Sequence, residues 1–196
     1  MTASPGAVAE QPARAVEVPQ APRPDAERVL PAVPIRSAAV EDHASESSAP
    51  PDRVAIPTLD LDLPVRPVGV HDDGSMEVPE NPSVVGWYRF GPAPGSAKGA
   101  TVLAAHVDSL RYGLGPFAQL KTLQPGAEVL VSDTAGRTIT YRVEEVTRTG
   151  KADLVDAGVF DRSGTPRLHL ITCGGSFHPE SRTYSDNVIV TAIPAE

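Results

Sequence analysis

The 196-residue chain contains a single cysteine, so it can form neither an internal disulfide nor a zinc site built from several cysteines. It has no run of about 18 apolar residues that could span a bilayer. No basic N-terminal region followed by an apolar stretch marks a signal peptide. The net charge of −8, without a basic stripe, argues against a nucleic-acid partner. If the protein works outside the cell, we expect its exporting segment to be missing from this sequence.

Aromatic residues are absent from the first 52 positions, which hold nine of the 21 prolines. Such a segment buries too little apolar surface to fold, and its prolines make it a semi-extended spacer. We therefore expect residues 1–52 to be a disordered Pro/Ala-rich linker and residues 53–196 to be one folded domain. Composition does not distinguish a solvated tail without a specific function from a stalk that holds the domain away from a surface.

The folded domain is a succession of short extended segments separated by turn residues. The expected strands cover residues 53–57, 65–70, 84–90, 100–107, 128–131, 137–143, 167–173 and 187–192. Residues 133–136 connect two of them as a hairpin, and residues 116–120 could form a helical turn with proline at its start. Seven or eight short strands with almost no long helical period predict an all-β barrel or sandwich.

The only cysteine lies in the stretch Arg167-Leu168-His169-Leu170-Ile171-Thr172-Cys173-Gly174-Gly175. Leucine and isoleucine favour a strand here, and the two glycines are expected to end it. Cys173 is thus predicted to occupy the last position of a strand, where a rigid element holds the thiol and a substrate can reach it. Taken alone, a free cysteine is more often a small buried hydrophobe.

A histidine with complementary chemistry is predicted at the end of another strand. A thiol with its usual pKa of about 8.5 is mostly protonated at neutral pH. His106 could take that proton and later give one to a leaving amine, which is what a cysteine acyl-transfer enzyme needs. Donors for an oxyanion could come from the backbone N–H groups after Cys173 or from Arg182, the only arginine after the cysteine.

A metal site built from His106, Asp108 and Cys173 is disfavoured, because structural zinc sites usually have more Cys or His ligands. We expect neither a metal nor a cofactor.

At these residues the sequence resembles the sortase family. The segment Leu170-Ile171-Thr172-Cys173 is similar to the sortase nucleophile strand, T-L-x-T-C. The segment Ala105-His106-Val107-Asp108-Ser109 resembles the G-H-V-D-S motif of the class F sortases of actinobacteria. Further similarity to that class lies in Gly86-Trp87-Tyr88, Gly95-Ser96, Cys173-Gly174-Gly175 and Tyr184-x-Asp186-Asn187-Val188-x-Val190. The resemblance covers about residues 54–193, essentially the whole folded part.

The resemblance implies a single closed sortase-type β-barrel with short helical turns that acts as a cysteine transpeptidase, a thiol protease in the broad sense. By resemblance, Cys173 is the nucleophile, His106 the general acid and base, and Arg182 the residue that orients the substrate and stabilises the oxyanion. In many sortases the arginine stands at the start of the last strand, where this chain has Ser185, Asp186 and Asn187.

The implied reaction is cleavage of a sorting signal similar to L-P-x-T-G, through a thioester on Cys173. The partners would be surface proteins that carry the signal and an amine acceptor, either a cell-wall precursor or a pilin-like protein. We expect a monomer at the extracellular face of the cell membrane, with its anchor absent from this sequence. One alternative is a hydrolase with water as the main acceptor. Another is a non-catalytic surface-binding domain, which the presence of His106, Cys173 and Arg182 together disfavours.

Overall fold

The computed structural model describes residues 49–150, 153, 158–180 and 183–195. Residues 1–48 of the linker expected over residues 1–52 lie outside the described residues. Its last two residues, Pro51 and Asp52, belong to the first strand. Within the described ranges, no helix is both long and apolar enough to cross a membrane.

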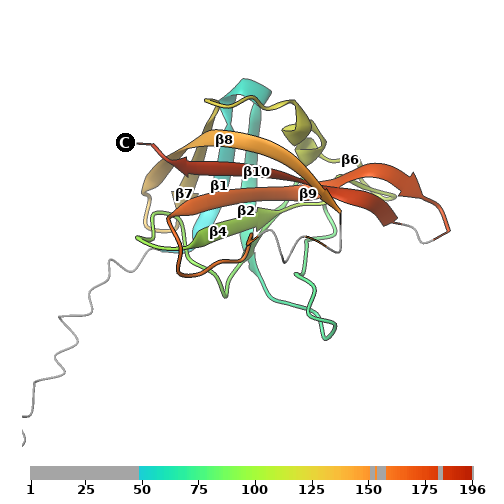
Figure 1. Ribbon diagram of the computed structural model, residues 1–196, viewed down its shortest axis with the longest axis horizontal. Coiled ribbons are helices and arrows are strands. Elements are labelled where there is room, and N and C mark those ends of the chain that lie inside the picture. The colour runs from blue at the N-terminus through green and yellow to red at the C-terminus, as the bar shows by residue number, and fades with distance from the viewer. Residues whose placement is uncertain (1–48, 151–152, 154–157, 181–182, 196) are drawn as a thin grey trace, which may run out of the picture. The chain divides into compact units, whose positions relative to one another are not determined.

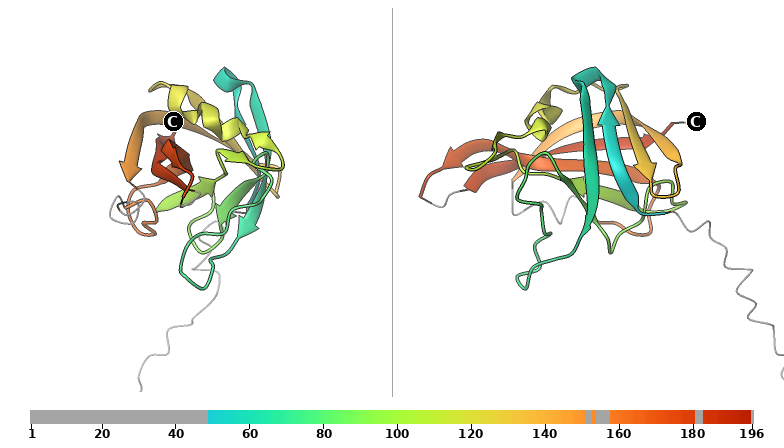
Figure 2. Two further views of the ribbon diagram at one scale, coloured as in Figure 1. Left: turned by 90° about the vertical axis from the view of Figure 1, so that its right-hand side faces the viewer. Right: turned by 180° about the vertical axis from the view of Figure 1, so that it is seen from behind.

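Among the described residues, eight strands form a closed barrel in the order β1-β2-β3-β4-β9-β10-β8-β7, which the pairing of β7 with β1 completes (Figure 1). Their bounds are β1 Pro51–Ile56, β2 Leu61–Val68, β3 Val85–Tyr88, β4 Ala100–Ala104, β7 Glu128–Asp133, β8 Thr138–Gly150, β9 Arg167–His178 and β10 Thr183–Pro194. Only the pairs β2–β3 and β4–β9 are parallel. The left view of Figure 2 shows the sheet curling round its interior. The predicted all-β barrel is confirmed.

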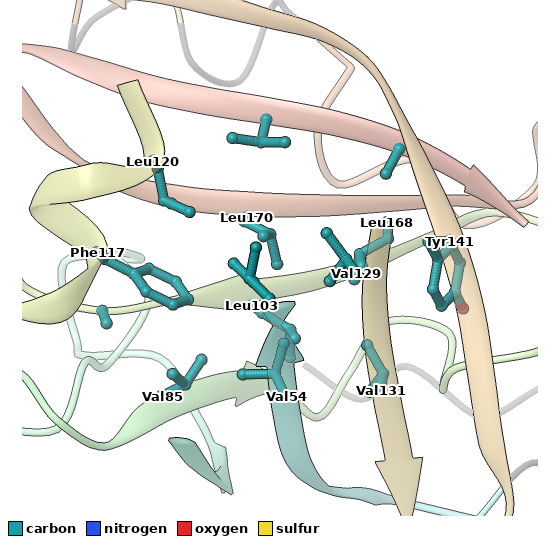
Figure 3. Close-up of a cluster of buried hydrophobic side chains, with 14 of the residues drawn as sticks. Val54, Val85, Leu103, Phe117, Leu120, Val129, Val131, Tyr141, Leu168 and Leu170 are labelled. Carbon is teal, nitrogen blue, oxygen red and sulfur yellow. The ribbon is translucent and has the colours of Figure 1, made fainter. Parts of the chain in front are cut away.

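The barrel interior is filled by alternate residues of its strands, because successive side chains of a strand point to opposite faces. Leu168 and Leu170 of β9 are fully buried there, as are Val129 and Val131 of β7. Figure 3 shows these side chains gathered round Leu103 of β4. The intervening residues of β9, among them Cys173, consequently lie on the outer face of the barrel.

A short 3-10 helix, η3 (Pro116–Thr122), supplies further residues to the core. Its Phe117 and Leu120 are fully buried in the interior cluster. Proline suits the first position of a helix because its missing N–H would have no partner there. The expected helical turn is confirmed and runs two residues further than predicted. A second 3-10 helix, η2 (Pro57–Leu59), connects β1 to β2.

A second, smaller apolar cluster covers part of the outer face. It contains Val102 and Ala104 of β4, Ile171 of β9, Ile189 of β10 and Val159 from the segment before β9. Met76, Val78 and Phe160 pack against it while remaining partly exposed. The outer face next to Cys173 is thus apolar and partly covered, although it lies outside the barrel.

The prediction that the glycine pair ends the cysteine strand is wrong. Strand β9 passes through Gly174 and Gly175 to His178, and in Figure 1 its hairpin with β10 projects past the other strands. The pairing with β10 shifts register between Tyr184 and Asp186, so that Gly175 and Ser176 together face Ser185. Gly175 has φ +77°, which glycine adopts at little cost. Gly175 and Ser176 therefore form a bulge that redirects the strand.

His106 is also placed differently from the prediction, because β4 ends at Ala104. The histidine follows two residues later, in the connection to a small separate hairpin. That hairpin consists of β5 (Asp108–Ser109) and β6 (Gly113–Leu114), which pair with each other. His106 therefore sits on the segment that joins the barrel to this hairpin.

Candidate active site

The parallel pairing of β4 with β9 brings His106 and Cys173 side by side. In this register Ala104 is opposite Ile171, and Ala105 N–H donates to the Ile171 carbonyl over 3.1 Å. His106 lies two residues after Ala104, and Cys173 lies two residues after Ile171. Both also line the same two cavities. The structure therefore brings together the two residues that the sequence paired on chemical grounds.

Thr172, the neighbour of the cysteine, fixes the segment that leads to the histidine. Its hydroxyl donates to the carbonyl oxygen of Ala105 over 2.8 Å, and its side chain is buried. A buried hydroxyl needs a hydrogen-bond partner, and the Ala105 carbonyl provides it at the end of the barrel interior. It attaches the residue before His106 to the residue before Cys173.

One cavity beside the two residues is an apolar groove on the outer face of the barrel. It has a volume of about 380 Å³ and is lined by Met76, Val78, Ala104, Phe160 and Ile171. His106, Cys173 and Asn187 also line it. An extended peptide with apolar side chains could lie in this groove with a carbonyl group next to the thiol.

A second cavity, the histidine pocket, lies between the two hairpins that project near the thiol. It has a volume of about 490 Å³ and is lined by residues of the β5–β6 hairpin, such as Asp108 and Leu114, and by Phe177 and Tyr184 of the β9–β10 hairpin. A third cavity of about 760 Å³ also reaches Cys173 and has Lys121 and Arg148 in its wall. The half-buried thiol is therefore reached from several directions.

Tyr184 and Asp108 form a hydrogen bond across the histidine pocket. The tyrosine hydroxyl donates to Asp108 Oδ2 over 2.5 Å. This bond to a carboxylate raises the pKa of Tyr184 to about 12, and burial and the negative charges of Asp108 and Cys173 act in the same direction. Both residues belong to the motifs quoted from the sequence, but no role was predicted for either, because nothing local indicates that they meet.

Asn187 was also given no role, although it is the cross-strand partner of the cysteine. In the ladder between β10 and β9, Asn187 is opposite Cys173. Directly opposed residues of an antiparallel pair point to the same face, so its carboxamide stands beside the thiol. The asparagine is 8% exposed and lines the apolar groove. The nearest signal in the sequence was its place in the Asp186-Asn187-Val188 motif.

Arg182, the third predicted site residue, lies outside the described residues, so its role stays a prediction. His169 shares the outer face of β9 with Cys173 and is buried against Thr191, whose hydroxyl is 3.3 Å from His169 Nδ1. Burial, with a smaller effect of the positive Arg167, lowers the pKa of His169 to about 4. This second histidine is therefore uncharged at neutral pH. Among the described side chains, no group of three or more His, Cys, Asp or Glu is placed to hold a metal ion.

Comparison with known proteins gives a consistent result. A family model described as the sortase domain matches residues 54–195. Sortase C-1 from Actinomyces oris is a similar solved structure, at 22% identity and a TM-score of 0.57 over 74% of this chain and 71% of that chain. Sortase C from Clostridium perfringens SM101 has 16% identity and a TM-score of 0.55 over 74% and 68%. Group B Streptococcus Pilus Island 1 sortase C2 has 20% identity and a TM-score of 0.56 over 74% and 73%. At these identities the structural likeness shows the fold alone. No curated protein matches the chain.

Proposed function

The chain belongs to the sortase family of cysteine transpeptidases, and we propose that its substrate is a sorting signal similar to L-P-x-T-G. The observation that carries this proposal is the placing of His106 beside Cys173 by the parallel register of β4 and β9, next to an apolar groove. The groove would hold the apolar residues of the signal and present its threonine carbonyl to the thiol.

In the first half of the reaction, the Cys173 thiol gives its proton to His106, and Cys173 Sγ attacks the carbonyl carbon of the threonine. The S–C bond forms, and the oxygen carries the negative charge of a tetrahedral intermediate. His106 gives a proton to the glycine nitrogen, the C–N bond breaks, and the glycine fragment leaves as an amine. The signal is then held as a thioester on Cys173.

In the second half, an acceptor amine attacks the thioester carbonyl. His106 takes the proton of the attacking nitrogen, the new amide C–N bond forms, and the S–C bond to Cys173 breaks. No oxidant, metal or nucleotide is needed, because a thioester is activated enough to be aminolysed. If water attacks instead, the same steps give a free carboxylate.

We further propose that the enzyme is of the class F type and acts at the extracellular face of the cell membrane. The motifs around His106 and Cys173 support the class, because they are similar to G-H-V-D-S and to the T-C-G-G pattern of that class. The partners would be surface proteins that carry the signal and an amine on a cell-wall precursor or a pilin-like protein. The residues before β1, which begins at Pro51, would serve as the linker that precedes the catalytic domain.

Mass spectrometry of the protein mixed with a peptide that contains Leu-Pro-Ala-Thr-Gly tests the function directly. We expect an adduct equal in mass to the peptide up to threonine, attached to Cys173. Addition of an amine such as triglycine should release it as an amide, and the ratio of amide to acid measures transfer against hydrolysis. If no adduct forms with any peptide of this type, the proposed substrate class is wrong.

The apolar groove predicts a specific effect of removing an aromatic side chain. Phe160 lines the groove and packs edge-on against Tyr88 at 5.2 Å between ring centroids. Loss of its contact with the peptide should raise KM about tenfold, because burying part of an aromatic ring contributes about 1.4 kcal/mol. The measurement is the KM of Phe160→Ala for an internally quenched signal peptide, with kcat nearly unchanged.

Phe90 provides a matched control for that measurement. It contacts the same Tyr88 ring edge-on at 5.7 Å but does not line the groove. Phe90→Ala should therefore leave KM at its wild-type value. Equal effects of the two substitutions on KM would place the peptide elsewhere.

A further prediction separates two possible oxyanion donors, Arg182 and Asn187. If the guanidinium acts on the acyl oxygen, Arg182→Ala should slow acylation about 100-fold, which is the usual effect of losing one oxyanion donor. Arg182→Lys should recover only part of the rate, because it keeps the charge but loses the planar fork. Acylation rates measured by rapid mixing give both numbers.

Asn187→Ala is the companion variant, because its carboxamide stands opposite Cys173 in the register. A wild-type rate for Arg182→Ala together with a large loss for Asn187→Ala would transfer the donor role from Arg182 to Asn187. If both variants acylate at the wild-type rate, the backbone N–H of Gly174 would remain as the oxyanion donor.

A further inference from the structure

The β5–β6 hairpin that follows His106 has few attachments to the barrel. Its two strands pair with each other and belong to a sheet separate from the barrel. Leu110 and Leu114 on it are 94% and 76% exposed, so little apolar burial holds the hairpin in place. Its position is therefore set by specific contacts and by the η3 segment that follows it, which Phe117 anchors in the core.

One of these contacts connects the hairpin to the backbone of His106. Gly115 N–H donates to the carbonyl oxygen of Val107 over 2.8 Å, which closes the base of the hairpin. Gly115 is also so close to His106 that a Cβ placed there would be 2.7 Å from the His106 carbonyl oxygen. A displacement of the hairpin would consequently be transmitted to the histidine.

Another contact is the hydrogen bond from the Tyr184 hydroxyl to Asp108 Oδ2, at 2.5 Å. Tyr184 is opposite Phe177 on the β9–β10 hairpin, and the two rings are 5.2 Å apart between centroids. The bond therefore joins the hairpin that follows the histidine to the hairpin that continues the cysteine strand. Both of its residues line the histidine pocket together with His106 and Cys173.

We propose that Asp108 and Tyr184 form a clasp that holds His106 in register with Cys173, and that both are positioning residues for proton transfer. The proposal rests on the proposed function, in which His106 protonates the leaving amine. A bond between a hydroxyl and a carboxylate is stronger than one between neutral groups. It can therefore fix a hairpin that has little other support. A phenol is protonated and can donate at neutral pH, and the raised pKa of Tyr184 extends this to more alkaline pH.

Four variants dissect the clasp. Tyr184→Phe keeps the ring beside Phe177 and removes only the donor, while Asp108→Ala removes the acceptor. Asp108→Asn keeps an acceptor oxygen without the charge, so it should be the mildest of the single changes. The double variant Asp108→Ala/Tyr184→Phe shows whether the two residues act through the same bond. The control is Tyr112→Phe, because Tyr112 lies on the same hairpin and its hydroxyl makes no hydrogen bond within the described residues.

Peptide cleavage should show the effect in kcat. Tyr184→Phe and Asp108→Ala should each lower kcat about tenfold, with KM and Tm nearly unchanged, because one hydrogen bond to a charged group is lost. The double variant should be no slower than either single variant, and Tyr112→Phe should match the wild type. Losses that multiply in the double variant, or a wild-type kcat for Tyr184→Phe, would overturn the clasp.

A second readout needs no peptide and so separates the clasp from the proposed function. The rate of Cys173 alkylation by iodoacetamide is measured against pH for the wild type, the clasp variants and His106→Ala. The profiles of the clasp variants should lie between those of the wild type and His106→Ala, because the imidazole is held less closely to the thiol. Clasp variants with the wild-type profile would overturn the proposal even if the enzyme cleaves peptides. The intermediate profiles would support it even if the tested peptides are not substrates.

Discussion

Cys173→Ala is expected to abolish cleavage of a sorting-signal peptide in a protein that still folds. Without the sulfur no thioester can form, and the carboxamide of Asn187 is not a nucleophile. The thiol is half-buried on the outer face of β9, so its removal should lower the free energy of unfolding by only about 1 kcal/mol. Cleavage of an internally quenched peptide and the thermal unfolding curve together measure both quantities.

Cys173→Ser is the stricter control for that result. It retains a nucleophilic atom of similar shape, but a hydroxyl is far less readily deprotonated than a thiol, so we expect almost no turnover. The serine variant should still bind the peptide, which fluorescence polarisation of a labelled signal would show. Undiminished cleavage by well-folded Cys173→Ala would contradict the assignment of this residue as the nucleophile.

The parts of the fold that the sequence predicted are those determined locally. Strand-forming residues and the turn residues between them identified β7, β8 and β9, and Pro116 marked the start of η3 correctly. Closure of the barrel depends instead on pairings between residues far apart in the chain, such as Val54 with Val131. No local pattern distinguishes a closed barrel from an open sandwich, and only the family resemblance favoured closure.

The bulge at Gly175 and Ser176 shows why the end of the cysteine strand was misplaced. Two glycines are a common place for a strand to stop, because they weaken its pairing. Here the opposite strand supplies Ser185, whose hydroxyl accepts a hydrogen bond from Ser176 N–H over 3.0 Å. That partner lies nine residues away across a hairpin, so the continuation of β9 could not be read from the glycines themselves.

The candidate site likewise contains residues that the sequence could predict and residues that it could not. The pairing of His106 with Cys173 could be inferred because their chemistry is complementary and each comes directly after a run of buried residues. The contact of Asp108 with Tyr184 spans 76 residues of sequence, and nothing local to either residue indicates that the two meet. Positioning residues of this kind become visible only when the strand register is known.

The second large effect is expected for His106→Ala, which should lower the acylation rate on an amide substrate about 1,000-fold. The leaving group of an amide is a poor one unless its nitrogen is protonated, and general acid–base catalysis contributes about 100- to 10,000-fold in enzymes. The binding of the peptide should change little, because the apolar groove remains. His178→Ala is the matched control, since His178 is exposed at the far end of β9 and lines none of the three cavities that reach Cys173.

The chemistry of the leaving group tests whether the imidazole acts as a proton donor and not merely as a wall of the pocket. A peptide thioester with the same sequence needs no proton on its leaving sulfur. With this substrate, the acylation rate of His106→Ala should therefore be much closer to the wild-type rate than it is with the amide. Added imidazole should in turn recover part of the amide rate, because the substitution leaves space beside Cys173 in the histidine pocket. If His106→Ala instead loses the same factor on the amide and on the thioester, the histidine affects thiol reactivity alone. The proton for the leaving amine would then have to come from another group that reaches Cys173.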